Sequence, residues 1–277
     1  MTPTPAAMQE QARPAYQMYV GGSWVDACSA ATLTSENPAT EEAVATFPAA
    51  SAADVDTAVD AAREAAGAWA ATPWMQRAAA LRQLADRIVD QAKQLAELDT
   101  IDSGNPINGM RGDVAGAVAE LRYFAGLGGE AKGMTLPGDP GMLTYTMREP
   151  YGVVGRIIPF NHPLKFAAGK CAAPLMAGNA VILKPAEQTS LSALELARLT
   201  EDVLPAGVFN VVTGTGAEAG AALAGHPQVP RVAFTGSVPT GRAVLRAGVE
   251  HIKHVTLELG GKNPMIVFPD ADPQQAA

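Results

Sequence analysis

Cysteine and histidine are scarce in this sequence. Only two of its 277 residues are cysteines, Cys28 and Cys171, and its 4 histidines are scattered. Two cysteines are too few to build a disulfide framework, and such a composition is typical of a reducing compartment. No CxxC pair and no Cys/His group with zinc spacing occurs. The sequence therefore excludes a disulfide scaffold and predicts no metal site.

Long apolar runs and an excess of basic charge are also absent. No run reaches the roughly 18 apolar residues of a transmembrane helix, and residues 1–14 lack the apolar core of a signal peptide. The 20 basic residues are outnumbered by 28 acidic ones, which leaves a net charge of −8. Nucleic acids and anionic membranes both attract basic surfaces. We therefore expect a cytoplasmic protein that binds neither nucleic acid nor a membrane.

The sequence does contain enough apolar material for a large core. Hydrophobic residues make up 48% of the chain and charged residues 17%, which excludes a disordered protein. A chain of 277 residues is compatible with one large domain or two modest ones.

The first half of the chain has a mainly helical pattern after a short entry. Two β-prone runs around a Gly-Gly pair predict a hairpin at residues 19–26. Ser51 and Asp54 have capping-box spacing before a helical apolar pattern, and Pro73 ends that helix. Further helices are predicted at residues 75–101 and 113–126, then a loop at 132–141 and a strand at 142–148. These Ala-rich helices carry no chemistry, and we interpret them as structural.

From Tyr151 onward, short apolar runs alternate with helical stretches. Continuous apolar strands separated by helices are typical of a parallel sheet with helices on both faces. Strands are predicted at residues 153–158, 180–183, 208–212, 232–234 and 255–259, and helices at 164–177, 190–203, 218–224 and 240–247. Ligands of such sheets bind beyond the carboxyl ends of the strands, so functional residues are expected directly after each strand.

The first predicted strand is followed by the motif PFNHP. Asn161 in this motif lies between a strand and a helix, and two prolines stiffen the turn. A side-chain amide held there could donate a hydrogen bond to an oxyanion that develops during a reaction. Alternatively, Asn161 caps the following helix, and the residues alone do not decide between the two interpretations. His162 is more typical of loop packing than of a catalytic base.

The second predicted strand is followed by the motif KPAE. Its cation, Lys184, and its carboxylate, Glu187, suit a ligand with hydroxyl and charged groups. A carboxylate accepts hydrogen bonds from both hydroxyls of a ribose and repels a 2′-phosphate, which favours NAD over NADP. Alternatively, the two side chains form a surface ion pair, which contributes about 0–1 kcal/mol.

Two glycine-containing motifs follow the third and fourth predicted strands. GTGAEAG, at residues 214–220, is not a dinucleotide fingerprint, because its last glycine comes one residue too late. In FTGS, Gly236 and Ser237 open a helix whose backbone N–H groups suit a pyrophosphate. Alternatively, this is an ordinary capped turn.

The fifth predicted strand ends in the motif LELGGKNP. Glu258 is the only carboxylate at this apolar strand end and directly precedes Leu259 and two glycines. We expect this end to be buried, which would raise the pKa of Glu258 toward that of a general base. The alternative is a buried structural carboxylate paired with Lys262 or Lys170.

The five motifs PFNHP, KPAE, GTG, FTGS and LELGGKNP have the order and spacing of the aldehyde dehydrogenase superfamily. The chain resembles this family from about Val20 onward. The resemblance implies an α/β fold: a Rossmann-like parallel sheet with flanking helices, an N-terminal helical segment and part of an oligomerisation arm. It also implies the oxidation of an aldehyde to a carboxylic acid with NAD, with NADP as the less favoured cofactor.

The resemblance assigns a role to each motif residue. It implies that Asn161 is the oxyanion-hole amide and that Glu258 is the general base. It implies that Lys184 and Glu187 hold the adenosine ribose. The other residues that it places along the cofactor are Gly216, Gly236, Ser237 and Gly241 at adenine and pyrophosphate, Leu259 and Gly260 at nicotinamide, and Ile157, Ile158, Pro159 and Phe160 along the cleft. The family more commonly has Trp at the Phe160 position.

The family's nucleophile is a cysteine in a second domain, and no cysteine follows Glu258. Neither Cys28 nor Cys171 lies in a motif like that of the nucleophile. We therefore expect residues 1–277 to be the NAD-binding portion of an aldehyde dehydrogenase, truncated before its catalytic domain and unable to catalyse alone. Its expected parts are a helical part at 1–135, an oligomerisation strand at 136–152, a Rossmann-like part at 153–268 and the start of a catalytic domain at 269–277.

Three other interpretations stay open. The chain could be a non-catalytic NAD-binding module, one chain of a split enzyme, or an acylating relative that uses coenzyme A. Glu258 argues against the last, because a base that activates water favours hydrolysis. The expected partners are a small-molecule aldehyde in the complete enzyme and either further copies, as a homo-oligomer, or a complementary catalytic-domain chain. Without them, an unpaired strand edge and an apolar face would be exposed.

Overall fold

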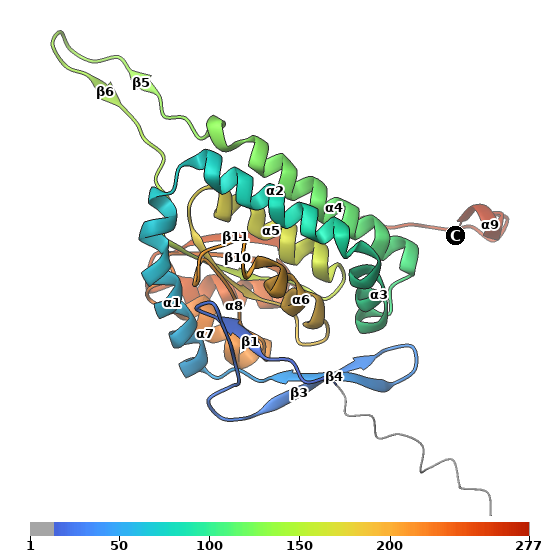
Figure 1. The fold of residues 1–277 in the computed structure, drawn as a ribbon. Helices are drawn as coiled ribbons and strands as arrows, with labels where there is room; N and C mark the ends of the chain where they lie inside the picture. The colour runs from blue at the N-terminus through green and yellow to red at the C-terminus, as the bar shows by residue number, and fades with distance from the viewer. Residues whose placement is uncertain (1–13, 277) are drawn as a thin grey trace, which may run out of the picture.

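A seven-stranded sheet forms the centre of the molecule (Figure 1). The computed structural model describes residues 14–276. The parallel strands are β7 (Val153–Ile157), β8 (Ala180–Lys184), β9 (Phe209–Val211), β10 (Arg231–Gly236) and β11 (His254–Leu259). The antiparallel hairpin of β1 (Met18–Val20) and β2 (Ser23–Val25) continues the sheet beside β9. The strand order is β11-β10-β7-β8-β9-β1-β2.

The central strands are apolar because both of their faces are covered. Every residue of β8 is buried, and all residues of β7 except Arg156 are buried. Each of the five strands predicted after Tyr151 corresponds to a strand of the parallel sheet. The predicted α/β class with a parallel sheet and flanking helices is therefore confirmed.

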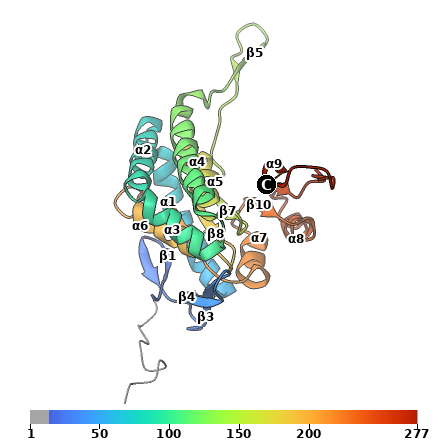
Figure 2. The same ribbon diagram turned by 90° about the vertical axis from the view of Figure 1, so that its right-hand side faces the viewer.

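Helices cover both faces of the sheet, and each set shares its own apolar core. One set consists of α2 (Trp74–Asp90), α3 (Ala92–Ser103), α4 (Ile107–Gly126), α5 (Pro163–Met176) and α6 (Leu191–Thr200). The other set consists of α1 (Ala52–Ala71), α7 (Ala221–Gly225) and α8 (Val238–Val249). The side view shows α4 and α8 on opposite sides of the molecule (Figure 2). This is the arrangement expected when parallel strands are connected by helices.

Two local predictions in the first half are confirmed. The β1–β2 turn consists of Gly21 and Gly22 with φ of 61° and 84°. A Cβ at Gly22 would lie 2.6 Å from the Cβ of Ala206, so glycine is required there. Helix α1 begins after Ser51, whose backbone N–H donates to Asp54 Oδ2 at 2.8 Å, as the capping-box spacing predicts.

The single helix predicted at residues 75–101 is wrong, because α2 and α3 are separate helices that meet at Gln91. Both α2 and α3 pack on α4, α5 and α6, and α3 buries Asp99 and Asp102 among them. Helix α4 starts after Pro106 rather than near residue 113, because its early residue Met110 is already part of the core.

Two hairpins differ from the prediction. An antiparallel pair, β3 (Thr32–Asn37) and β4 (Glu42–Pro48), is not evident from the sequence, because β3 is polar except for Leu33 and half of its residues are exposed. The strand predicted at 142–148 is too long. Only β6 (Thr144–Tyr145) pairs there, with β5 (Thr135–Leu136), in an arm that projects from the body (Figure 1).

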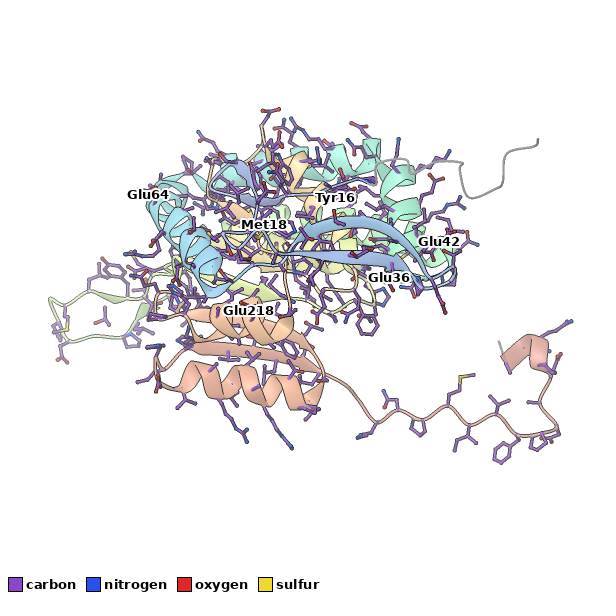
Figure 3. All side chains as sticks on the ribbon, turned by 90° about the horizontal axis from the view of Figure 1, so that it is seen from below. Tyr16, Met18, Glu36, Glu42, Glu64 and Glu218 are labelled. Carbon is purple, nitrogen blue, oxygen red and sulfur yellow. The ribbon has the colours of Figure 1, made fainter. Side chains whose placement is uncertain are left out.

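After β11 the chain runs away from the body as an exposed segment, residues 260–272, and reaches α9 (Pro273–Ala276) (Figure 3). Within residues 14–276, no helix has the length and apolar character needed to cross a membrane. The same residues contain no group of three or more His, Cys, Asp or Glu side chains arranged to hold a metal. The predicted absence of a signal peptide concerns residues 1–14. Of these residues, the structure describes only Pro14.

Candidate active site

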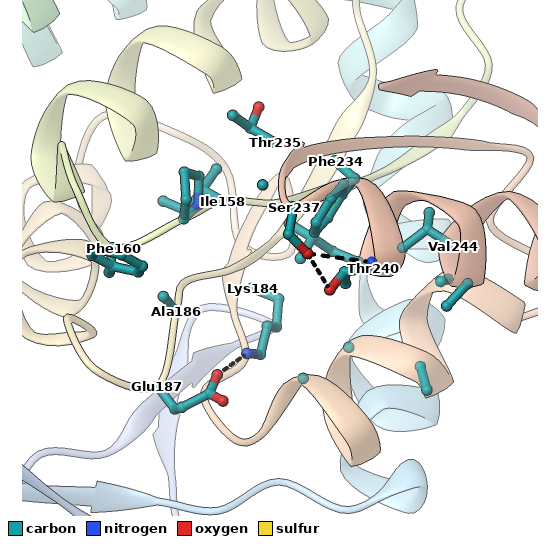
Figure 4. Close-up of a pocket in the computed structure, with 18 of the residues that line it drawn as sticks. Ile158, Phe160, Lys184, Ala186, Glu187, Phe234, Thr235, Ser237, Thr240 and Val244 are labelled. Atoms are coloured by element: carbon teal, nitrogen blue, oxygen red, sulfur yellow. Dashed lines mark hydrogen bonds and ion pairs between the residues drawn. The ribbon is translucent and has the colours of Figure 1, made fainter. Parts of the chain in front are cut away.

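A cleft of about 360 Å³ lies beyond the carboxyl ends of β7, β8 and β10, between the strand-end loops and helices α7 and α8 (Figure 4). Most of the predicted cofactor residues line it. They are Ile157, Ile158, Pro159, Phe160, Lys184, Glu187, Gly216, Gly236 and Ser237. Parallel strands end at the same edge of the sheet, which is why motifs far apart in the sequence meet here.

Lys184 and Glu187 form an ion pair in the floor of the cleft (Figure 4). The distance from Lys184 Nζ to Glu187 Oε2 is 3.1 Å, and the Lys184 side chain is 3% exposed. Burial lowers the pKa of Lys184, against the opposing effect of the Glu187 carboxylate. Burial alone would raise the pKa of Glu187, but backbone N–H groups and Lys184 together lower it. Glu187 is therefore a charged acceptor at neutral pH, and this is not the exposed surface pair of the alternative interpretation.

The start of α8 provides backbone N–H groups on the opposite side of the cleft. Ser237 is the N-cap, and its hydroxyl accepts a hydrogen bond from the Thr240 N–H at 3.3 Å. The positive end of a helix of this length favours an anionic group. A Cβ at Gly236 would lie 2.5 Å from the Phe234 ring, so glycine lets that ring line the cleft. The predicted helix opening is thus present and directed at the cleft.

The GTGAEAG motif forms a π-helical turn, η3 (Gly216–Gly220), before α7. The Thr215 hydroxyl caps this turn by accepting from the Glu218 N–H at 3.2 Å. The backbone N–H of Gly216 is one of the groups that lower the pKa of Glu187. The motif therefore supports the carboxylate of the KPAE motif, although it is not a dinucleotide fingerprint.

The sequence interpretation missed the wall of the cleft that consists of small side chains on two helices. These residues are Gly220 at the end of η3, Ala221 and Ala224 on α7, and Ala243, Val244 and Ala247 on α8. Their signal in the sequence is the helical spacing of small residues, which leaves a slot between two helices for a flat apolar group. Gln188, Phe234, Thr235 and Thr240 also line the cleft without having been predicted as cofactor residues.

Three predicted cofactor residues do not line this cleft. Gly241 is buried on α8, and a Cβ there would lie 2.7 Å from Leu259 Cδ2, so this glycine lets α8 approach β11. Leu259 and Gly260 lie at the end of β11 and are exposed. Gly241 and Leu259 instead join α8 to the edge strand.

Asn161 lies in the loop between β7 and α5 with an exposed side chain. Its carbonyl oxygen accepts a hydrogen bond from Asn105 Nδ2 at 2.9 Å. The N-cap of α5 is His162, so the interpretation of Asn161 as the helix cap is wrong. His162 Nδ1 lies 2.5 Å from Asp113 Oδ2 on α4. This contact agrees with the packing interpretation of His162 and holds the loop against α4.

Glu258 is exposed, so the prediction that it lies in a buried strand end is wrong. The physical reason is that β11 is the edge strand and pairs only with β10. Within residues 14–276, no ion pair joins Glu258 to Lys170 or Lys262. Glu258 does share a second cavity, of about 250 Å³, with Lys170 and Arg156 on the α5 side of the sheet.

Neither cysteine has the environment of a reactive thiolate. Cys171 is buried on α5, and burial raises its pKa to about 12. Cys28 is exposed, and a hydrogen bond with the Asp54 carboxylate, together with its charge, raises the pKa of the thiol. A thiol attacks carbonyl groups as the thiolate, so both environments favour an inert cysteine.

Comparisons with known proteins agree with this geometry. The profile of the Aldehyde dehydrogenase family matches residues 24–277. A hydroxyisobutyraldehyde dehydrogenase from Mycolicibacterium austroafricanum is 45% identical over 260 residues, which are 94% of this chain and 52% of that protein. The chain spans about half the length of the curated relatives that it matches.

Solved structures show the same relationship. PnpE in complex with nicotinamide adenine dinucleotide has a TM-score of 0.89 and 43% identity, over 94% of this chain and 54% of that one. The NAD⁺ complex of an aldehyde dehydrogenase from Bacillus cereus has a TM-score of 0.88 and 43% identity, with the same coverage of 94% and 54%. The family profile and these identities lead to one conclusion: this chain belongs to the aldehyde dehydrogenase family.

Proposed function

We propose that this chain binds NAD in the cleft and supplies the cofactor-binding half of an enzyme that oxidises an aldehyde to a carboxylic acid. The observation that carries the proposal is the ion pair of the buried Lys184 and the partly exposed Glu187, which faces the start of α8 across one cleft. One side offers an ionised acceptor for ribose hydroxyls, and the other offers N–H groups for a pyrophosphate. Two structural neighbours bind this cofactor.

The shape of the cleft fits a dinucleotide. The slot between α7 and α8 has small apolar walls suited to an adenine ring, and Gly216 has open space at its Cα, so the ligand can approach the backbone. Glu187 also disfavours a 2′-phosphate, because its carboxylate is charged at neutral pH. When bound, NAD supplies the acceptor for the hydride that leaves the substrate. The residues of this chain bind and orient it.

Two further residues act on the substrate in the proposed reaction. The exposed amide of Asn161 donates a hydrogen bond to the oxygen of the aldehyde carbonyl as that oxygen becomes negative after nucleophilic attack. Glu258 accepts a proton from the water that releases the acid.

The proposed function does not extend to catalysis by residues 1–277 alone. The covalent route needs a thiolate, and the surroundings of Cys28 and Cys171 keep both in the thiol form. The purified chain should therefore produce no NADH from NAD with propanal or benzaldehyde. Steady NADH production, followed by absorbance, would contradict this part of the proposal.

Titration calorimetry tests cofactor binding directly. The 277-residue chain should release heat on binding NAD and should bind NADP more weakly, because Glu187 faces the 2′ position. Circular dichroism before and after the titration is the control for native material. Native chain that gives no heat with millimolar NAD overturns the proposal.

A non-catalytic NAD-binding module and one chain of a split enzyme share this binding prediction. They differ in the effect of a second chain that carries a cysteine motif. Restored NADH production on mixing supports the split enzyme, and unchanged binding without turnover supports the module. An acylating, coenzyme-A-dependent activity is disfavoured by Glu258, because a base that activates water directs the reaction toward hydrolysis.

A further inference from the structure

The carboxyl-terminal turn of α3 contacts the starts of two other helices. Asp99 on α3 is 0% exposed, and its Oδ2 accepts a hydrogen bond from the Leu164 N–H of α5 at 3.1 Å. Asp102, one turn later, accepts from the Leu191 N–H of α6 at 3.2 Å. The first N–H groups of a helix have no partner within the helix, so a carboxylate there both pairs them and compensates the helix dipole.

These two helix starts directly follow the two loops of the candidate site. Helix α5 follows the loop at residues 160–162, which contains Asn161, and α6 follows the loop that contains Glu187. The loops also touch, because Thr189 Oγ1 donates to the Phe160 carbonyl at 3.3 Å. Asn105, just beyond α3, donates to the Asn161 carbonyl at 2.9 Å. One short stretch of chain, remote from the cleft in sequence, therefore holds both loops.

We propose that Asp99 is a positioning residue, which sets the conformation of the 160–162 loop and the direction of the Asn161 amide through the start of α5. The inference rests on the proposed function for the role of Asn161. The contact itself is independent of the cofactor. Asp99 touches neither substrate nor cofactor in this scheme and acts only through the Leu164 N–H.

The surroundings of Asp99 make this contact sensitive to pH. Burial raises the pKa of Asp99 to about 7, with a further contribution from the charges of Asp102 and Asp113. The Ser192 hydroxyl of α6 is close enough to lower this pKa, yet neither Asp99 Oδ1 nor Ser192 Oγ has a hydrogen-bond partner within the described residues. A hydroxyl donor favours the ionised carboxylate, as the Leu164 N–H does, so deprotonation of Asp99 strengthens its hold on the start of α5.

Other charged groups near the start of α5 are engaged with Asp113 on α4. His162 Nδ1 lies 2.5 Å from Asp113 Oδ2, and Lys165 Nζ lies 3.7 Å from Asp113 Oδ1. Histidines in general titrate in the same pH range as the one expected for Asp99. An experiment must therefore separate the effect of His162 from that of Asp99.

Nuclear magnetic resonance of the chain with ¹⁵N-labelled Leu and Asn provides that test. The backbone signal of Leu164 and the side-chain signal of Asn161 should both shift with a midpoint near pH 7, the value to which burial raises the pKa of Asp99. Asp99→Asn keeps an acceptor of the same shape but cannot ionise, so both shifts with pH should disappear while the chain stays folded. The control His162→Gln should retain them.

The outcomes are distinct. Loss of the titration in Asp99→Asn together with its retention in His162→Gln supports the inference. A titration that persists unchanged in Asp99→Asn, or one that is absent from the native chain, overturns it. All spectra are recorded without NAD, so a chain that titrates but binds no NAD loses the proposed function and keeps this positioning role.

Discussion

The floor of the cleft and the outer edge of the sheet have similar sequences but opposite environments. Strand β8 is apolar up to Lys184, and β11 has Val255, Leu257 and Leu259 along its length with Glu258 near its carboxyl end. Lys184 is 2% exposed and paired, whereas Glu258 is exposed. The difference arises because β8 lies between β7 and β9, while β11 has only β10 beside it. Position in the sheet decides whether a strand-end charge is buried.

The largest expected effect comes from truncating an apolar side chain in each of the two strands. Leu183→Ala in β8, at a site that is 0% exposed, should lower the free energy of unfolding by about 2–5 kcal/mol. Leu259→Ala in β11, at a site that is 38% exposed, should cost less than about 1 kcal/mol. Urea denaturation measures both. Equal losses would mean that the edge is as well packed as the centre.

The second comparison concerns how stability depends on pH when a carboxylate is buried, as Asp99 is, or exposed. Burial raises the pKa of Asp99 from its ordinary value of 3.8 to about 7, so between these values the native state binds more protons than the unfolded state. Its contribution to stability is therefore greatest below pH 3.8 and falls as the pH rises to about 7. Asp99→Asn should gain stability relative to the native chain over this range, on the order of a few kcal/mol.

The matched control for that measurement is Asp270→Asn in the exposed segment after β11. Its stability should follow the native chain at every pH, because an exposed carboxylate changes its surroundings little on folding. Urea midpoints collected from pH 4 to pH 8 provide the comparison. If the difference in urea midpoint between Asp99→Asn and the native chain did not change with pH, Asp99 would have the same ionisation in the folded and the unfolded state.

A third comparison concerns the binding of NAD. Glu187→Gln removes a charged acceptor from the cleft, and charge-assisted hydrogen bonds contribute about 1.5–3 kcal/mol. NAD affinity should therefore fall about tenfold or more. Glu218→Gln changes an exposed carboxylate on the neighbouring turn that does not line the cleft, so it should leave affinity within about twofold. Similar affinity for both variants in calorimetry would remove Glu187 from the binding site.

The smallest effect on stability is expected in the segment that follows β11. Ile266 and Phe268 are 72% and 69% exposed, so replacing both with Ser should change the free energy of unfolding by less than about 0.5 kcal/mol. The same change should reduce the binding of a hydrophobic dye and slow aggregation, because it removes part of an exposed apolar surface. Unchanged dye fluorescence would indicate that the exposed surface lies elsewhere, for example on the β5–β6 arm.

Features that depend on local chemistry were predictable from the sequence. The strands after Tyr151 are recognisable because a strand buried on both faces must be apolar throughout. Glycine at positions 21 and 22 and the Ser51–Asp54 capping box determine a turn and a helix start through local backbone geometry. The order of the motifs after each strand placed Lys184, Glu187 and Ser237 in one cleft, since parallel strands end at a common edge.

Features that depend on the neighbours of an element came only from the tertiary structure. The break between α2 and α3 at Gln91 has no proline or glycine to mark it in the sequence. The burial of Asp99 and the exposure of Glu258 depend on what lies beside them. Apolar pattern, turn residues and caps act over a few residues and were determined by the sequence itself. Strand order and helix packing bring distant residues together and decided which charges are buried, paired or exposed.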